Sequence, residues 1–342
     1  TRYSKEKEGY LMTNRRVRWM TAALAAALSL TACAAPAAVR VTEEATPLAA
    51  AAAETKAVPA ATGTESAVEA PAVDLLLLPE ASGTQVRKND QAEIDYSHPE
   101  DGYIMVRYPA QSEKRIKVQV KGPSTTYTYN LTPGSEDWTT FPLSDGNGWY
   151  QVAVYRNISG TKYSQQLSAG FEVTLADEFA PYLRPNQYVD YSGAEKTVAK
   201  AAELVKGKKT ALEQVDAIYQ FVVKNLSYDY IKAQNVKSGY LPALDKVLEK
   251  KKGICFDYAA LMTGMLRSQG IPCKLVVGYA GSAYHAWISV WTEETGWLES
   301  TIYFDGQSWQ RMDPTFASTG GQSASIMKYI GDGKNYSVKY LY

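Results

Sequence analysis

The spacing of apolar residues changes once along this chain of 342 residues, near residue 177. Before that point apolar residues alternate with polar ones, as Ile116, Val118 and Val120 do. After it they recur every three or four residues, as Ile218 and Val222 do. Alternation is typical of half-buried strands, and the longer spacing is typical of amphipathic helices. We therefore expect β structure over residues 86–176, followed by a region that begins with helices.

Turn-forming residues divide residues 86–176 into short stretches of predicted strand. They include Gly122-Pro123, Pro133-Gly134 and Gly146-Asn147-Gly148. Short strands at this spacing predict a small β-sandwich domain, for which an immunoglobulin-like topology is one option. Its tyrosines could face a glycan or a peptide, but tyrosine on strands more often serves ordinary packing. We expect this domain to space or shape access to the region that follows.

Residues 177–342 are predicted to hold helices first and then strands. Ser192 to Glu195 and Thr210 to Glu213 each match the Ser/Thr-x-x-Glu pattern, which caps the start of a helix. A shorter helix is expected around residues 243–250. The expected strands are 273–279, 285–291, 308–315 and a last strand through Tyr336, Val338 and Tyr340.

One cysteine lies at the predicted start of an amphipathic helix. Cys255 precedes apolar residues at helical spacing, among them Tyr258, Leu261 and Met265, and Gly270 follows as a stop signal. The unpaired N–H groups and the dipole of a first helical turn favour a thiolate, the form of cysteine that attacks carbonyl carbon. Cys255 is therefore a candidate nucleophile, although a cysteine in a helix is more often buried filler.

The chain also offers a base and an orienting carboxylate for this thiol. It has two histidines, His98 and His285, and three cysteines, which leaves little for a zinc site, so neither a metal nor another cofactor is expected. Cys255 as nucleophile, His285 as base and Asp313 as orienting group would make a thiol triad. Thirty residues separate Cys255 from His285, and twenty-eight separate His285 from Asp313. These separations are those of a compact core.

Five motifs in this region occur together and in order, and they resemble the core motifs of the transglutaminase-like superfamily. The resemblance covers about residues 210–315, does not extend to the predicted sandwich, and includes Tyr228 upstream. The motifs are Gly253-Ile254-Cys255-Phe256-Asp257-Tyr258-Ala259, Gly270-Ile271-Pro272, Val277-Gly278-Tyr279, His285-Ala286-Trp287 and Met312-Asp313-Pro314-Thr315.

The resemblance implies a papain-like α+β fold for residues 177–342, in which the cysteine helix packs against an antiparallel sheet. It implies acyl transfer from a peptide or protein amide through a thioester on Cys255, without a cofactor. The backbone N–H of Cys255 would help to stabilise the oxyanion, and Tyr228 is the candidate for a second donor, with core packing as its equal alternative. Asp257 is expected to stabilise the helix start, and Trp287 to wall the site.

Three alternatives stay open at this point. The thioester could end on water, as in a peptidase or amidase, or on an amine, as in a transamidase. The same fold could belong to a binding or scaffold lipoprotein without turnover. Cys273 could form a disulfide with Cys255, which would abolish thiol chemistry, or it could be a buried small hydrophobe in a strand, which we favour.

Residues 1–33 carry an apparent export signal. Arg15, Arg16 and Arg18 precede an apolar run of residues 20–30 that is too short to span a bilayer comfortably. Leu30-Thr31-Ala32-Cys33 then follows, and it resembles the lipobox of bacterial lipoproteins, in which the peptide is cleaved before an acylated cysteine. The resemblance implies that Cys33 is lipidated and that the protein is an extracytoplasmic, membrane-anchored lipoprotein of the bacterial cell envelope. An ordinary secretory signal or a buried helix is the alternative.

Residues 34–85 are dominated by alanine with glutamate, threonine and proline, apart from the apolar run at residues 73–78. Such a composition buries too little surface to offset chain entropy, so we expect a disordered tether between the lipid anchor and the folded domains. Residues 1–32 hold six basic and two acidic side chains, which leaves thirty basic and thirty-four acidic over the rest of the chain. This slightly acidic remainder indicates no nucleic-acid partner. The expected partners are a peptide or protein substrate and the membrane.

Overall fold

The computed structural model describes residues 76–298, 314–319 and 336–342. Cys33 and the tether predicted for residues 34–85 lie outside this range, apart from residues 76–85. Asp313 also lies outside the described residues. Among the described residues, no helix combines the length and the hydrophobicity needed to cross a bilayer.

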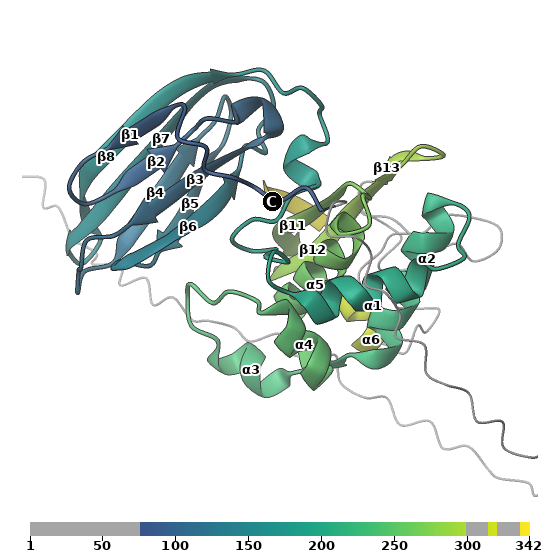
Figure 1. The fold of residues 1–342 in the computed structure, drawn as a ribbon. Coiled ribbons are helices and arrows are strands. Elements are labelled where there is room, and N and C mark those ends of the chain that lie inside the picture. Colours follow the sequence, from purple (N-terminus) through teal and green to yellow (C-terminus); the bar gives the residue numbers. More distant parts are fainter. Residues whose placement is uncertain (1–75, 299–313, 320–335) are drawn as a thin grey trace, which may run out of the picture. The chain divides into compact units, whose positions relative to one another are not determined.

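Two four-stranded antiparallel sheets form from residues 86–173 (Figure 1). Their strands are β1 (Val86–Lys88), β2 (Glu93–Asp95), β3 (Tyr103–Tyr108), β4 (Ile116–Lys121), β5 (Thr126–Leu131), β6 (Ser135–Pro142), β7 (Gly148–Ser159) and β8 (Lys162–Val173). The strand orders are β1-β2-β3-β6 and β5-β4-β7-β8, and Val106 of the first sheet and Val118 of the second belong to one hydrophobic core. The predicted sandwich is confirmed. Alternate residues of β4 and β5 are buried, as the sequence pattern requires, whereas β3 of the first sheet is buried at every position except Arg107.

The second part of the chain begins with helices. They are α1 (Glu195–Val205), α2 (Ala211–Asn225), α3 (Tyr230–Asn235), α4 (Leu244–Lys250), α5 (Cys255–Arg267) and α6 (Pro314–Thr319), with short 3-10 helices at Pro99–Asp101 and Ala180–Tyr182. Thr210 caps α2 as predicted, since its hydroxyl oxygen accepts a hydrogen bond of 3.1 Å from the N–H of Glu213. The prediction that Ser192 caps α1 is wrong, because α1 begins after Ala194. Its first turn is capped instead by Asp245 of α4, whose carboxylate accepts from the N–H groups of Lys196 and Thr197.

A third sheet of four strands, in the order β13-β12-β11-β14, and a two-stranded parallel pair, β9 with β10, complete the described fold. The strands are β9 (Ser227–Tyr228), β10 (Lys252–Gly253), β11 (Cys273–Ala280), β12 (Ala283–Thr292), β13 (Gly296–Leu298) and β14 (Tyr336–Leu341). The four-stranded sheet is antiparallel throughout, and it confirms the strands predicted over residues 273–279 and 285–291 and the last strand. The strand predicted over residues 308–315 differs, because Pro314 and Thr315 begin α6 and residues 308–313 lie outside the described range.

Helix α5 is the centre of this second part. Every residue from Asp257 to Arg267 is buried, and the helix contacts α1, α2, α4, α6 and strands β11 and β12 (Figure 1). Leu261, Met262 and Met265 are fully enclosed by these neighbours. A helix buried on all sides is fixed in place by packing. Its first residue, Cys255, is therefore held at a defined point of the fold.

Candidate active site at the start of helix α5

Cys255 is the first residue of α5, and its side chain is partly exposed. Ile254 before it has an extended backbone (φ −96°, ψ 176°), so the helix begins abruptly at the cysteine. The first N–H groups of a helix have no partners within the helix, and they provide partial positive charge beside the thiol. The geometry predicted for a nucleophile at a helix start is therefore present.

Asp257, two residues into the helix, is fully buried and accepts three hydrogen bonds. Its donors are the N–H of Ile254 at 2.8 Å, the hydroxyl of Tyr240 at 2.5 Å and the ammonium of Lys232 at 2.6 Å. A carboxylate taken out of water needs such partners, since an unpaired buried charge is strongly unfavourable. Burial and the bond to Asp257 raise the pKa of the Tyr240 phenol, which therefore stays a neutral donor.

Glycine is required at position 253 because a side chain there would have no room. A Cβ atom at this position would lie 2.5 Å from the Cβ of Asp257, closer than side chains approach one another. The expectation that Asp257 stabilises the helix start agrees with its bond to Ile254. Sequence reasoning missed its partners Lys232 and Tyr240, because neither lies at a regular spacing from Asp257 and α3 was not predicted.

Tyr228 lies beside the segment that leads into Cys255. Strand β9 pairs with β10 so that Tyr228 is opposite Gly253, and the N–H of Asp229 donates to the carbonyl of Gly253 at 2.8 Å. The half-buried ring of Tyr228 contacts Tyr230 edge to face, with 5.0 Å between centroids. The fold thus brings Tyr228 to the start of α5, and its role as an oxyanion donor remains a prediction.

His285 lies on β12, the strand against which α5 packs. His285 is 5% exposed, and its ring stacks on that of Trp287, with 6.2 Å between centroids and 20° between planes. Its cross-strand neighbour is Gly278, where a Cβ atom would lie 2.0 Å from the carbonyl oxygen of Ser337. Glycine at this position therefore lets β14 approach the part of the sheet that carries His285.

The third member of the predicted triad, Asp313, lies outside the described residues. Pro314, which follows it directly, begins α6, and α6 packs against α5. The hydroxyls of Tyr258 on α5 and Ser318 on α6 lie 3.2 Å apart, and Ser318 also donates to the carbonyl of Leu226. The predicted orienting role of Asp313 remains a prediction, as does lipidation of Cys33.

Whereas Cys255 is partly exposed, Cys273 is buried. It is fully buried at the start of β11, and its sulfur lies 3.5 Å from the hydroxyl oxygen of Thr263. Burial raises the pKa of the Cys273 thiol to about 11. Both cysteines are free thiols, so the disulfide alternative is not supported and Cys273 is the buried small residue that we favoured.

One group of potential metal ligands comes together within the described ranges, and it is remote in sequence from Cys255. His98, Glu100 and Asp101 lie close to one another before β3. Asp101 already accepts a hydrogen bond of 2.8 Å from the guanidinium of Arg184, which occupies one carboxylate of the group. We assign no cofactor role to these residues.

Comparison with known proteins finds a protein family that part of this chain resembles. Residues 198–314 match the family model described as Transglutaminase-like superfamily. The matched range includes Tyr228, Cys255, His285 and Asp313. The second part of the chain therefore contains a transglutaminase-like core, as the sequence motifs indicated.

Individual relatives cover limited parts of the chain. A Protein-glutamine gamma-glutamyltransferase of Pseudomonas aeruginosa is 34% identical over 68 residues, which are 16% of this chain and 10% of that protein. The human Kyphoscoliosis peptidase is 24% identical over 233 residues, 66% of this chain and 33% of the peptidase. The chain thus spans about a tenth and a third of the lengths of these two relatives. Among solved structures, the periplasmic domain of TgpA from Pseudomonas aeruginosa is similar with a TM-score of 0.32 and 19% identity, over 71% of this chain and 79% of that one.

Proposed function

We propose that this protein is a transglutaminase-like cysteine acyltransferase that acts on peptide or protein amides. The observation that carries the proposal is the partly exposed Cys255 at the first position of a helix that is buried from Asp257 onward. The match of residues 198–314 to the superfamily model supports it. A thiol fixed at a helix start and open to a substrate is suited to attack on a carbonyl carbon.

In the proposed reaction, His285 removes the proton of the Cys255 thiol, and Asp313 orients the imidazole. The sulfur forms a bond to the carbonyl carbon of the amide, and the oxyanion accepts a hydrogen bond from the N–H of Cys255, with Tyr228 as the candidate second donor. The C–N bond then breaks, and the amine or ammonia leaves with the proton held by His285. Water or a second amine next attacks the thioester and regenerates the thiol, which gives hydrolysis or transamidation.

We further propose that the enzyme works outside the cytoplasm, attached to the cell envelope through a lipid on Cys33. The support is the basic, apolar and small-residue pattern that ends at Cys33. Mass spectrometry of protein extracted from membranes should find a diacylglyceryl group on Cys33. Release of a Cys33→Ser variant from the membrane fraction would agree with it, and unmodified Cys33 in membrane-bound protein would contradict it.

Alkylation of the native protein tests the nucleophile without knowledge of the substrate. With iodoacetamide at pH 8, we expect mass spectrometry to find Cys255 modified first. Cys273 is the internal control, because a thiol whose pKa is raised from 9.0 to about 11 holds roughly a hundredfold less thiolate at this pH than it would without the shift. Labelling of Cys255 no faster than that of Cys273 would contradict the proposal.

Turnover tests the chemistry itself. Wild type should release ammonia or a short amine from a library of glutamine-containing peptides, and Cys255→Ala should not. Cys273→Ala, which removes the other thiol, should retain the activity of the wild type. Equal and negligible release by wild type and Cys255→Ala would instead favour the alternative of a binding or scaffold lipoprotein that uses the same fold.

A further inference from the structure

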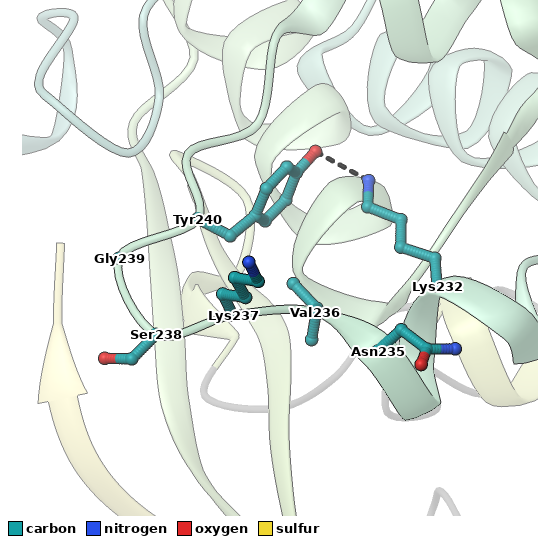
Figure 2. A pocket seen from close by; sticks show the side chains of 7 residues that line it. All are labelled: Lys232, Asn235, Val236, Lys237, Ser238, Gly239 and Tyr240. Carbon is teal, nitrogen blue, oxygen red and sulfur yellow. Dashed lines mark hydrogen bonds between the residues drawn. The ribbon is translucent and has the colours of Figure 1, made fainter.

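A surface pocket lies next to the start of α5, beyond the residues proposed for catalysis. Its volume is about 400 Å³, and it is lined by α3 and the loop that follows: Lys232, Asn235, Val236, Lys237, Ser238, Gly239 and Tyr240 (Figure 2). Pockets of this size take small ligands or one or two side chains of a larger one. Two of its residues, Lys232 and Tyr240, also bind Asp257, so the pocket and the Cys255 helix share a wall.

The loop that forms this pocket has a fixed shape. The Lys232 ammonium lies 4.0 Å over the ring of Tyr240 and donates to its hydroxyl, a bond that Figure 2 shows across the pocket. Gly239 has a φ of +88°, and a Cβ atom there would lie 2.5 Å from the side-chain nitrogen of Asn130 on β5. A side chain at position 239 would therefore be strained and would also collide. The loop thus contacts the side chain of Asn130 at Gly239.

The surroundings of the pocket are basic. Lys232 and Lys237 lie in its lining. Outside the lining, Lys250, Lys251 and Lys252 form an exposed run that ends two residues before Ile254 and the helix of Cys255, on the segment that pairs with β9. The neighbouring carboxylates are each paired: Asp229 with Lys252 at 3.5 Å, Asp257 with Lys232 at 2.6 Å, and Glu249, next to Lys250 in the sequence, with Lys196. Lys237, Lys250 and Lys251 form no ion pair with any acidic residue of segments 76–298, 314–319 and 336–342. The surface before the nucleophile thus keeps an excess of positive charge, although the chain as a whole is neutral.

Large apolar side chains are exposed on the same elements. Tyr230 is 56% exposed and Ile231 72% exposed on α3, and Val236 and Leu241 on the following loop are 38% and 42% exposed. Four large apolar side chains are thus exposed to water within twelve positions of the sequence. Exposed apolar groups gathered beside a pocket indicate contact with another molecule.

We propose that this pocket and the lysines around it bind an acidic side chain of the acyl-donor peptide, and that Ile231, Val236 and Leu241 contact its apolar neighbours. This inference rests on the proposed function and narrows its substrate class to acidic peptides. The excess of lysine supplies charge complementarity to glutamate or aspartate. The parallel pairing of β9 with β10 places Tyr228, two residues before α3, opposite Gly253, two residues before Cys255, so the elements that carry the pocket and the thiol are adjacent at this point.

Binding is measured separately from chemistry with a full-length Cys255→Ala variant and three fluorescein-labelled peptides. Each peptide has a central glutamine between leucines, flanked by glutamates, by serines or by lysines. By fluorescence anisotropy we expect the glutamate peptide to bind about tenfold more tightly than the serine peptide, and the lysine peptide to bind most weakly. The preference should shrink as salt is raised, because exposed charges are screened.

Charge reversal then locates the site. Lys237→Glu in the Cys255→Ala background should weaken binding of the glutamate peptide about three- to tenfold and leave the serine peptide within about twofold. Lys121→Glu is the matched control, an exposed lysine on β4 of the sandwich, and should change neither. Equal affinity for the three peptides, or equal effects of the two reversals, would overturn the proposal.

Two further outcomes would distinguish the proposed pocket from the proposed activity. Preferential binding of the glutamate peptide without turnover by wild type would support the pocket and overturn the proposed activity. Turnover that is indifferent to flanking charge would support the activity and overturn the pocket. An anionic membrane surface is the competing occupant: loss of binding to phosphatidylglycerol vesicles in Lys237→Glu, with no discrimination among the peptides, would also overturn the acidic-peptide assignment.

Discussion

A charged side chain is buried at each end of helix α5, and the two are stabilised by different kinds of partner. At the start, Asp257 is fully buried and forms an ion pair with Lys232, which is itself partly exposed. At the end, Arg267 is 2% exposed, and its guanidinium donates to backbone oxygens of Arg184, Cys273 and Tyr342. Both charges oppose the dipole of the helix, as a first-turn acid and a last-turn base should.

The partners explain what each end does. Asp257 is bound by side chains that lead outward to a surface pocket, so the start of the helix is connected to the region where a substrate would arrive. Among the described residues, Arg267 donates to main-chain oxygens of Arg184, Cys273 and Tyr342. Arg184 and Tyr342 are far from it in the sequence, so the end of the helix joins distant segments to the strand that follows it. Burial of the guanidinium lowers the pKa of Arg267 from its usual value, which shows the cost of that enclosure.

The largest loss of stability is expected when Arg267, at the end of α5, is replaced. Arg267→Met removes three hydrogen bonds at once, to the carbonyls of Arg184, Cys273 and Tyr342, of which Tyr342 keeps the N–H of Leu275 as a donor. We expect a loss of about 3–5 kcal/mol in unfolding free energy. Urea unfolding followed by tryptophan fluorescence measures it. Arg87→Met, which changes an exposed arginine of β1, should stay within about 0.5 kcal/mol of wild type. A loss at Arg267 no larger than that at Arg87 would show that these hydrogen bonds contribute little.

A smaller effect is expected at the other end. Lys232→Met should cost about 2 kcal/mol, less than Arg267→Met, because the Asp257 carboxylate retains Tyr240 and the N–H of Ile254. The carboxylate left without its cation would oppose formation of the Cys255 thiolate two residues away, so alkylation of Cys255 by iodoacetamide should slow severalfold. Lys237→Met, in the same loop but without contact to Asp257, should change neither value. An unchanged alkylation rate in Lys232→Met would show that the ion pair between Lys232 and Asp257 does not affect the reactivity of the Cys255 thiol.

The smallest effect concerns alkaline pH and Cys273, beside the Arg267 end. Burial raises the pKa of its thiol from 9.0 to about 11, so the folded state favours the neutral thiol. The associated stability is complete below about pH 9 and is lost as the pH rises towards about 11, with a loss of about 1 kcal/mol by pH 10. Between pH 8 and pH 10, wild type should therefore lose about 1 kcal/mol more than Cys273→Ala. Between pH 6 and pH 8 the two should change alike, and equal declines over both intervals would refute the assignment.

Local patterns in the sequence predicted a substantial part of this structure. The alternation of Ile116, Val118 and Val120 predicted β4, because alternate residues of a half-buried strand face opposite sides. Thr210 predicted the start of α2, since a cap bonds to residues three positions away. The apolar spacing after Cys255 placed that residue at a helix start, and the ordered motifs indicated the superfamily whose model matches residues 198–314.

Contacts between segments far apart in the chain were decided by the tertiary structure alone. The cap of α1 comes from Asp245, about fifty positions away, and not from Ser192, because a buried helix start accepts whichever carboxylate packing brings to it. Lys232 reaches Asp257 across twenty-five positions. Arg267 reaches Tyr342 across seventy-five. The sequence alone determined that Cys255 begins a helix, because helix starts depend on near neighbours; which charges surround the two ends of that helix depended on how the whole chain packs.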